Sequence, residues 1–281
     1  MRVCLMIEGQ EDVTWEQWVA LAQTAERSGY EALFRSDHYL SVQGEHGRGS
    51  LDAWATLAAL GAVTSTIRLG TMVSPASFRH PSVLAKCAVT ADHVSGGRVE
   101  LGMGAGWLEA EHAAYGFPFH DTRTRMDVLE EQLQIVRGLF GDGSFSFEGE
   151  HYTLAEVDSL PKPVQRPGPP LIIGGSGGPR SLRLAAAYAD EYNTVFPTVE
   201  FCRELRGRLD ERLPLSIMTR LVVGDGGRPD DSSIGGTPAQ IVEQLRGYEA
   251  AGVTRVMLQH LAHEDLATVE LVGREVIPAV A

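Results

Sequence analysis

The stretch Arg68–Trp107, RLGTMVSPASFRHPSVLAKCAVTADHVSGGRVELGMGAGW, predicts a strand, a helix and a second strand. Arg68–Ser74 and Val99–Gly106 are apolar runs, and Pro81–Val94 between them places its apolar residues at helical spacing. Two apolar strands joined by a helix are typical of a parallel βαβ unit. Both strands end in small residues, at the face where parallel barrels bind ligands. Glycine there would let a flat ligand lie directly against the backbone.

The same alternation of strands and helices runs through the rest of the chain. It predicts an α/β fold, a (β/α)8 TIM barrel, with residues 1–281 forming a single domain. We expect insertions after the fourth strand and after the seventh. The first would include an irregular segment, Leu108–Thr122, and a hairpin, Phe145–Leu154, and the second, Gly224–Gly236, would be a mobile lid or plain disorder. An open dinucleotide-binding sheet is not favoured, because no G-x-G-x-x-G follows the first strand. The expected strands are Val3–Glu8, Ala32–Ser36, Arg68–Ser74, Val99–Gly106, Leu171–Gly174, Tyr192–Phe196, Leu215–Val223 and Arg255–His260.

Composition excludes several classes of function. The formal net charge of -13 makes nucleic acid an unfavourable partner. No apolar run reaches the roughly 18 residues of a membrane span, and the start lacks a signal-peptide layout. Cys4, Cys87 and Cys202 are far apart, which indicates reduced thiols in a cytoplasmic protein. A metal site is not expected, because the first strand offers no His-x-His to join the histidines near residue 260.

A second glycine-rich turn, Gly174-Gly175-Ser176-Gly177-Gly178, leads from the fifth strand into a helix. Backbone N–H groups beside a helix N-terminus favour phosphate. Ser176 would add a hydroxyl, and Arg180 or Arg183 would add a charge. The alternative is a turn that merely needs the conformational freedom of glycine. Two such strand ends in one barrel suggest two parts of one ligand, an aromatic ring and its phosphate.

Taken together, these motifs resemble the bacterial luciferase-like superfamily, especially its shorter members that use the deazaflavin coenzyme F420. The resemblance covers nearly the whole chain. Its motifs are Ser36-Asp37-His38, Gly70–Ser74, Arg79-His80-Pro81, Ser95–Trp107, Ile173–Gly177 and Ala189-Asp190-Glu191.

The resemblance implies that a deazaflavin or flavin ring binds at the strand C-termini. It also implies a bulge with a non-proline cis peptide near Thr71-Met72-Val73. F420 is the expected cofactor and FMN the alternative. The expected cofactor contacts are His38, Thr71, Met72, Val73, Ser74, Gly104, Ala105, Gly106, Trp107, Gly174, Gly175, Ser176, Gly177, Gly178 and Arg180.

His38 is the candidate for proton transfer, because the resemblance places it beside the reacting carbon of the ring. Its ordinary pKa near ~6.5 suits an acid or a base. Asp37, the second candidate catalytic residue, would orient the imidazole or pair with a neighbouring arginine. Glu8, Trp107 and His260 are candidate substrate contacts, since each follows or ends a strand.

Three further residues near the fourth strand are given structural roles. Glu109 and Glu111 are expected to be solvated loop charges, and Arg125 is expected in an ion pair.

Trp107 stands where the sugar-phosphate dehydrogenases of the superfamily carry an acidic residue. Oxidation of a sugar alcohol is therefore not favoured.

The expected function is F420-dependent transfer of a hydride between the deazaflavin and an organic substrate, as reduction of a conjugated C=C or C=N bond. The alternatives are an FMNH2-dependent luciferase-like monooxygenase and a non-catalytic flavin-binding protein. The expected partners are a small-molecule substrate, a separate reductase that regenerates the reduced cofactor, and a second copy of the chain. The homodimer would form through the helices beside the second and third strands; a membrane partner is not expected.

Overall fold

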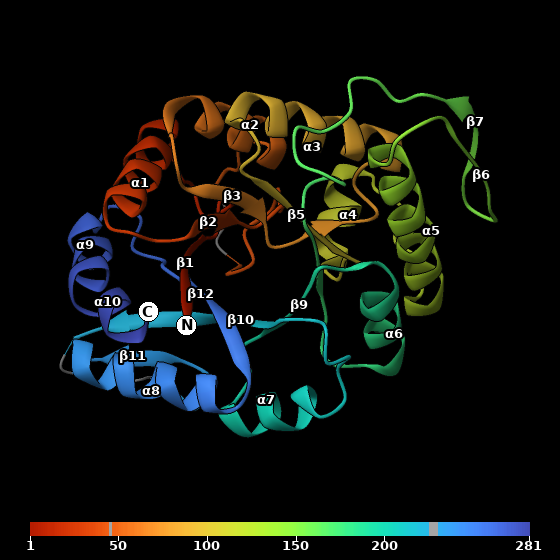
Figure 1. The fold of residues 1–281 in the computed structure, drawn as a ribbon. Coiled ribbons are helices and arrows are strands. Elements are labelled where there is room, and N and C mark those ends of the chain that lie inside the picture. Colours follow the sequence, from red (N-terminus) through yellow and green to blue (C-terminus); the bar gives the residue numbers. More distant parts are fainter. Residues whose placement is uncertain (45–46, 225–229) are drawn as a thin grey trace.

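A computed structural model describes residues 1–44, 47–224 and 230–281, and its centre is a closed barrel of eight parallel strands (Figure 1). Each strand pairs with the next along the chain, and the last pairs with the first, so the predicted (β/α)8 barrel is confirmed. The barrel strands are β1 Arg2–Ile7, β2 Ala32–Arg35, β3 Arg68–Thr71, β5 Val99–Gly104, β8 Leu171–Gly174, β9 Glu191–Val195, β10 Leu215–Val223 and β12 Val253–Gln259.

Helices surround the strands, and local sequence sets where several of them begin (Figure 1). Thr14 and Thr237 form capping boxes with Gln17 and Gln240, as expected for the first of these pairs. No helix in the described ranges is both long and apolar enough to cross a bilayer. The helices are α1 Trp15–Arg27, α2 Ala53–Val63, α3 Pro81–Ser95, α4 Glu109–Tyr115, α5 Thr122–Phe140, α6 Pro179–Tyr188, α7 Val199–Arg206, α8 Pro238–Ala250, α9 Leu266–Glu275 and α10 Ile277–Val280.

The third predicted strand is interrupted. After β3 the chain bulges and re-enters the sheet as β4, Ser74–Pro75, which pairs with β5. The peptide bond between Met72 and Val73 is cis, so the non-proline cis peptide expected from the resemblance is confirmed.

Both expected insertions contain regular structure. The segment 108–122 was expected to be irregular, but it contains α4. The antiparallel strands β6, Phe145–Glu148, and β7, Thr153–Val157, form the predicted hairpin. The segment 224–236 is not wholly a lid or disordered, because β11, Ile234–Gly236, is buried beside β10. Residues 225–229 of that segment lie outside the described ranges.

The barrel interior is apolar in its middle and charged near the N-terminal ends of the strands. Met6, Phe34, Met218 and Met257 belong to the cluster that fills the middle. A larger core lies between the strands and the helices. All three cysteines are free thiols, as expected.

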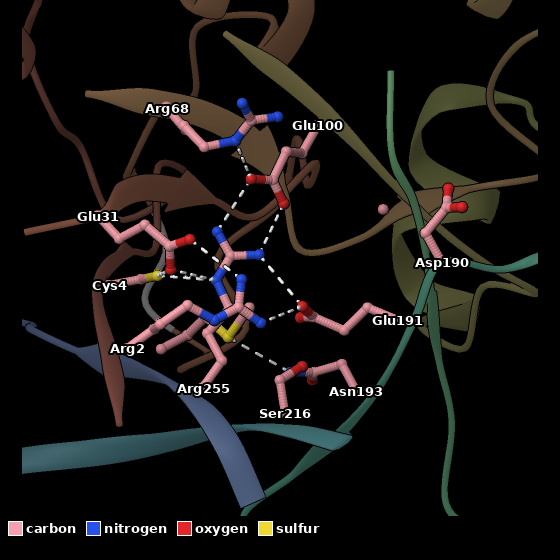
Figure 2. Close-up of polar contacts among 12 residues, drawn as sticks. Arg2, Cys4, Glu31, Arg68, Glu100, Asp190, Glu191, Asn193, Ser216 and Arg255 are labelled. Carbon is pink, nitrogen blue, oxygen red and sulfur yellow. Dashed lines mark hydrogen bonds and ion pairs between the residues drawn. The ribbon is translucent and has the colours of Figure 1, made fainter. Parts of the chain in front are cut away.

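Arg255 is the centre of the charged layer (Figure 2). It is 1 % exposed and binds both carboxylate oxygens of Glu100, at 2.7 and 3.0 Å. Glu191 lies 3.3 Å from the same guanidinium and Glu31 lies 3.0 Å from it. Burial opposes charge on Glu100, but Arg255 and a second cation, Arg68, hold its pKa below the ordinary value. One buried cation is therefore shared by three carboxylates.

Candidate active site at the barrel mouth

His38 lies at the mouth of the barrel, three residues after the end of β2. Its side chain is 14 % exposed, and its Nδ1 lies 2.8 Å from Oε2 of Glu111. The ring of Trp107 packs edge-on against the imidazole, with 5.8 Å between ring centroids. Trp107 itself is 63 % exposed. The predicted proton-transfer residue thus lies beside an exposed indole, as expected of a residue that faces a substrate.

Glu111 differs most from its predicted environment. It was expected to be a solvated charge, but it is completely buried. Besides His38, it accepts hydrogen bonds from the backbone N–H groups of Tyr39 and Leu40, the latter at 3.0 Å. The cause is the unpredicted helix α4, which turns Glu111 inward and leaves Glu109 exposed, as expected for Glu109.

The pKa of His38 is raised above its ordinary value. Burial alone would lower the pKa, but the hydrogen bond and charge of Glu111 outweigh it, with smaller contributions from Glu8 and Asp37. Because a carboxylate only accepts, Nδ1 of His38 must carry a proton in this hydrogen bond. The raised pKa favours the protonated imidazole, the form of His38 that can act as an acid.

Asp37 was predicted either to orient the imidazole or to pair with a neighbouring arginine, and it pairs with an arginine. Its Oδ2 accepts hydrogen bonds from Arg79 at 2.6 Å and from the hydroxyl of Ser74 at 2.6 Å. Arg79 also pairs with Asp52, which caps α2. Asp37 thus joins the end of β2 to the bulge, while Glu111 holds the imidazole. The structure supports a structural role for Asp37 rather than a catalytic one.

The four bulge residues differ in their access to the mouth. Thr71 and Ser74 are completely buried, and Met72 belongs to the interior cluster. Val73 is only partly buried. Of the four predicted ring contacts, Val73 is the side chain best placed to support a ligand directly.

The glycines at the strand ends accommodate Val73. A Cβ on Gly102 would lie 2.1 Å from the carbonyl oxygen of Thr71, and one on Gly104 would lie 2.7 Å from Val73. A Cβ on Gly174 would also crowd Val73, at 3.1 Å. We expected these glycines to let a ligand touch backbone. At Gly102, Gly104 and Gly174 the space left by the missing Cβ atom is instead occupied by residues of the bulge. A ring can lie on this bulge.

We expect Gly102→Ala to lower the free energy of unfolding by at least about 2 kcal/mol, because the added methyl overlaps a backbone oxygen that cannot move freely. Urea denaturation followed by circular dichroism measures the change. Gly247→Ala is the matched control, since its Cβ has an ordinary contact at 3.9 Å inside a helix. Equal stability of the two variants would show that the bulge does not require glycine at 102.

The second glycine-rich turn retains only part of its predicted phosphate site. The N–H of Gly175 binds the carbonyl of Asn193 at 3.0 Å, and that of Gly177 binds the hydroxyl of Tyr192 at 2.9 Å. Arg180 is paired with Asp127 and Glu130 on α5. The expected role of Arg180 as a phosphate ligand is therefore not supported. Ser176 is exposed, and it and Gly178 remain candidates at the start of α6.

The three predicted substrate contacts differ in orientation. Trp107 is open to solvent, as described above. Glu8 is 5 % exposed and is held by the amide groups of Gln259 and Gln10, at 2.6 and 2.8 Å. His260 is buried, and its Nε2 lies 3.1 Å from the carbonyl of Asp265. His260 is thus engaged by its own loop, which does not favour substrate contact.

Arg125 also differs from expectation. Among the described residues it has no carboxylate partner of the expected kind. It donates to the carbonyl of Gly106 at 3.1 Å and lies over the ring of Phe119, 4.2 Å from its centroid. It therefore fixes the segment that carries Trp107.

Two mouth residues were not found from the sequence. Val195 is 51 % exposed and Phe196 is 43 % exposed, both at the end of β9. Asn193 bonds to Ser216 inside the barrel, so alternation along β9 points Val195 toward the barrel axis as well. In a strand, a residue two positions after an inward-pointing residue also points inward, and this rule would have identified Val195. Like Trp107, Val195 and Phe196 are exposed apolar side chains at the carboxyl end of a barrel strand.

The chain forms a closed (β/α)8 barrel with His38 and a backbone bulge at its mouth, the face at which barrel enzymes carry their active sites. The chain belongs to the luciferase-like monooxygenase family, whose sequence profile matches residues 2–223.

Named relatives use two different cofactors. The chain is 33% identical over 186 residues to the F420-dependent hydroxymycolic acid dehydrogenase of Mycobacterium tuberculosis, covering 66% of this chain and 50% of the relative. It is 32% identical over 183 residues to the FMNH(2)-dependent dimethylsulfone monooxygenase of Pseudomonas putida, covering 64% and 48%. The protein is thus a flavin- or deazaflavin-dependent oxidoreductase that acts on a small molecule.

Among solved structures, the barrel superposes on an F420-dependent secondary alcohol dehydrogenase in complex with an F420-acetone adduct. The TM-score is 0.85, with coverage of 100% of this chain and 99% of that chain. The sequence identity is 18%, so this likeness establishes the fold alone.

Proposed function

We propose that the protein is an F420-dependent oxidoreductase that reduces a conjugated C=C or C=N bond of an apolar substrate. We propose also that residues 1–281 act as one catalytic domain. The observation that carries the proposal is the His38–Glu111 pair, with a distance of 2.8 Å, at the mouth of the barrel. The raised pKa of His38 favours its protonated form, which can donate the proton that reduction requires. The F420-dependent relative is consistent with this choice.

The residues at the mouth fit a deazaflavin. The partly buried Val73 offers a raised apolar support for a flat ring, and His38 lies at the same rim, after β2. Ser176 and Gly178, at the start of α6, are the candidates for its phosphate. Ala105, Gly106 and Trp107 would line the edge, while Gly104 and Gly174 act indirectly through Val73. Arg180 is left out of the site because two carboxylates already pair with it.

The chain's own residues would orient the substrate and supply the proton. When bound, the reduced deazaflavin provides the hydride that adds to one atom of the double bond. His38 donates a proton to the other atom, which completes the reduction. Trp107, Val195 and Phe196 favour an apolar or flat substrate and exclude water from around the reacting bond.

Two other functions are weighed against this proposal. The FMNH(2)-dependent relative favours a monooxygenase as the second candidate. A flavin-binding protein without turnover is the third, and it predicts that the proton donor at position 38 is dispensable.

A fluorescence titration with oxidised F420, and in parallel with FMN, tests the cofactor. We expect F420 to bind at least about tenfold more tightly, a difference of 1.4 kcal/mol. Tighter binding of FMN would contradict the proposal and favour the monooxygenase. If neither binds, the cofactor site inferred at the mouth is wrong.

We propose that the partners include a separate reductase and a second copy of the chain. Ala55, Ala62 and Val63 on α2 are exposed, as are Val83 and Val94 on the neighbouring α3. An exposed apolar surface on two adjacent helices is suited to contact with an identical surface.

A further inference from the structure

Within the described ranges, the carboxylate of Glu111 makes three hydrogen bonds, all with the segment that carries His38. Oε2 faces Nδ1 of His38, and Oε1 accepts from the backbone N–H groups of Tyr39 and Leu40. Glu111 has no exposed surface, so water does not compete for these hydrogen bonds. The side chain therefore fixes both the backbone after His38 and the direction of its ring.

The other ring nitrogen of His38, Nε2, is not engaged by the described protein. In the described part of the chain no protein group bonds to Nε2, and Nε2 is not among the fully buried polar atoms without a partner. The imidazole retains some exposure at the mouth, where it meets Trp107.

We propose that Glu111 is a positioning residue, which holds the imidazole of His38 through Nδ1 so that Nε2 is the nitrogen that exchanges a proton with the substrate. The role of Nε2 in turnover rests on the proposed function. The orientation of the ring and its tautomer do not depend on the proposed function, because they are properties of the free protein.

Glu111 is also the strongest charge acting on His38. The other charged groups facing the ring are Glu8 at the end of β1 and Asp37, whose own charge is compensated by Arg79. Glu111 alone combines a charge with a direct hydrogen bond to the imidazole. Replacing its carboxylate by an amide should therefore change the protonation of His38 more than removing any other single charge.

The test is long-range 1H–15N NMR of histidine-labelled protein over a pH series, in wild type and in Glu111→Gln. His38→Asn identifies the His38 signals among the nine histidines. In wild type we expect the neutral ring to carry its proton on Nδ1. In Glu111→Gln the amide N–H₂ would face Nδ1, so we expect the proton to move to Nε2 and the pKa to fall by about one unit or more.

Glu109→Gln is the matched control, because Glu109 lies on the same short helix but is exposed. It should leave the tautomer and the pKa of His38 unchanged. An Nε2–H tautomer in wild type, or the same pKa in wild type and Glu111→Gln, would overturn the proposal. If Glu111→Gln does not fold, the wild-type tautomer alone decides.

Kinetics then separate positioning from the proposed function. With an accepted substrate, Glu111→Gln should lower kcat about 100-fold and move the pH profile to lower pH, while F420 affinity changes less than about twofold. An unchanged kcat, despite a changed tautomer, would overturn the role of Nε2. Wild-type protein that binds neither F420 nor FMN would instead contradict the proposed function and leave the NMR result standing.

Discussion

Replacing His38 with asparagine is expected to lower kcat by about 10²–10⁴-fold, the usual contribution of a positioned acid. Asparagine can still donate a hydrogen bond to Glu111, so the loop after β2 should keep its conformation. It cannot supply a proton at neutral pH. We therefore expect the dissociation constant for F420 to change less than about threefold. Steady-state kinetics on a substrate found by screening unsaturated compounds and imines, with a fluorescence titration, measures both quantities.

The matched control for this substitution is His120→Asn, because His120 is exposed on the segment before α5. It should retain wild-type kcat. Wild-type reduction should also fall as the pH rises through the pKa of His38, which lies above its ordinary value, because only the protonated ring is an acid. Full activity of His38→Asn would show that this ring does not transfer the proton. Cofactor binding without conversion of any substrate by the wild-type protein would favour the alternative in which the protein only binds its cofactor.

Arg255→Met is expected to destabilise the fold by about 3–5 kcal/mol, because it removes the cation shared by Glu31, Glu100 and Glu191. Methionine replaces the aliphatic part of the arginine side chain but not its guanidinium, so the cost also includes the lost contact of that group with the ring of Phe34. What remains is a group of buried carboxylates with too few partners, since Glu100 and Glu191 are only 3 % and 5 % exposed. Urea denaturation gives the free energy of unfolding.

Arg274→Met provides the control for this second prediction. Arg274 pairs with Glu275 at 2.9 Å, but both side chains are largely exposed, at 64% and 44%. Removing such a pair should change stability by less than about 1 kcal/mol. A similar small change for Arg255→Met would mean that the carboxylates find other partners or take up protons.

The sequence alone predicted the elements whose causes are local. A helix such as α1 begins where Thr14 and Gln17 can bond each other's backbone, three residues apart. The strands were found because their apolar runs are continuous. The position of His38 at the mouth followed from the barrel itself, since every strand end lies on one face.

The rest depends on residues that meet only after the barrel closes. Glu111 lies 73 positions from His38, and Glu100 lies 155 positions from Arg255. Nothing in the spacing along the chain connects either pair. The role of Gly102, Gly104 and Gly174 was also unpredictable. The atoms next to these glycines belong to the bulge after β3, which is on another strand.

The close fit between Val73 and three glycines has a consequence for redesign. Gly102 and Gly104 come from β5 and Gly174 from β8, so three segments of the chain share one small volume. A library that varies position 73 alone would return mainly smaller side chains, since a larger one has no room on either neighbouring strand. A library designed to change the support for the cofactor should therefore vary positions 73, 102, 104 and 174 at the same time.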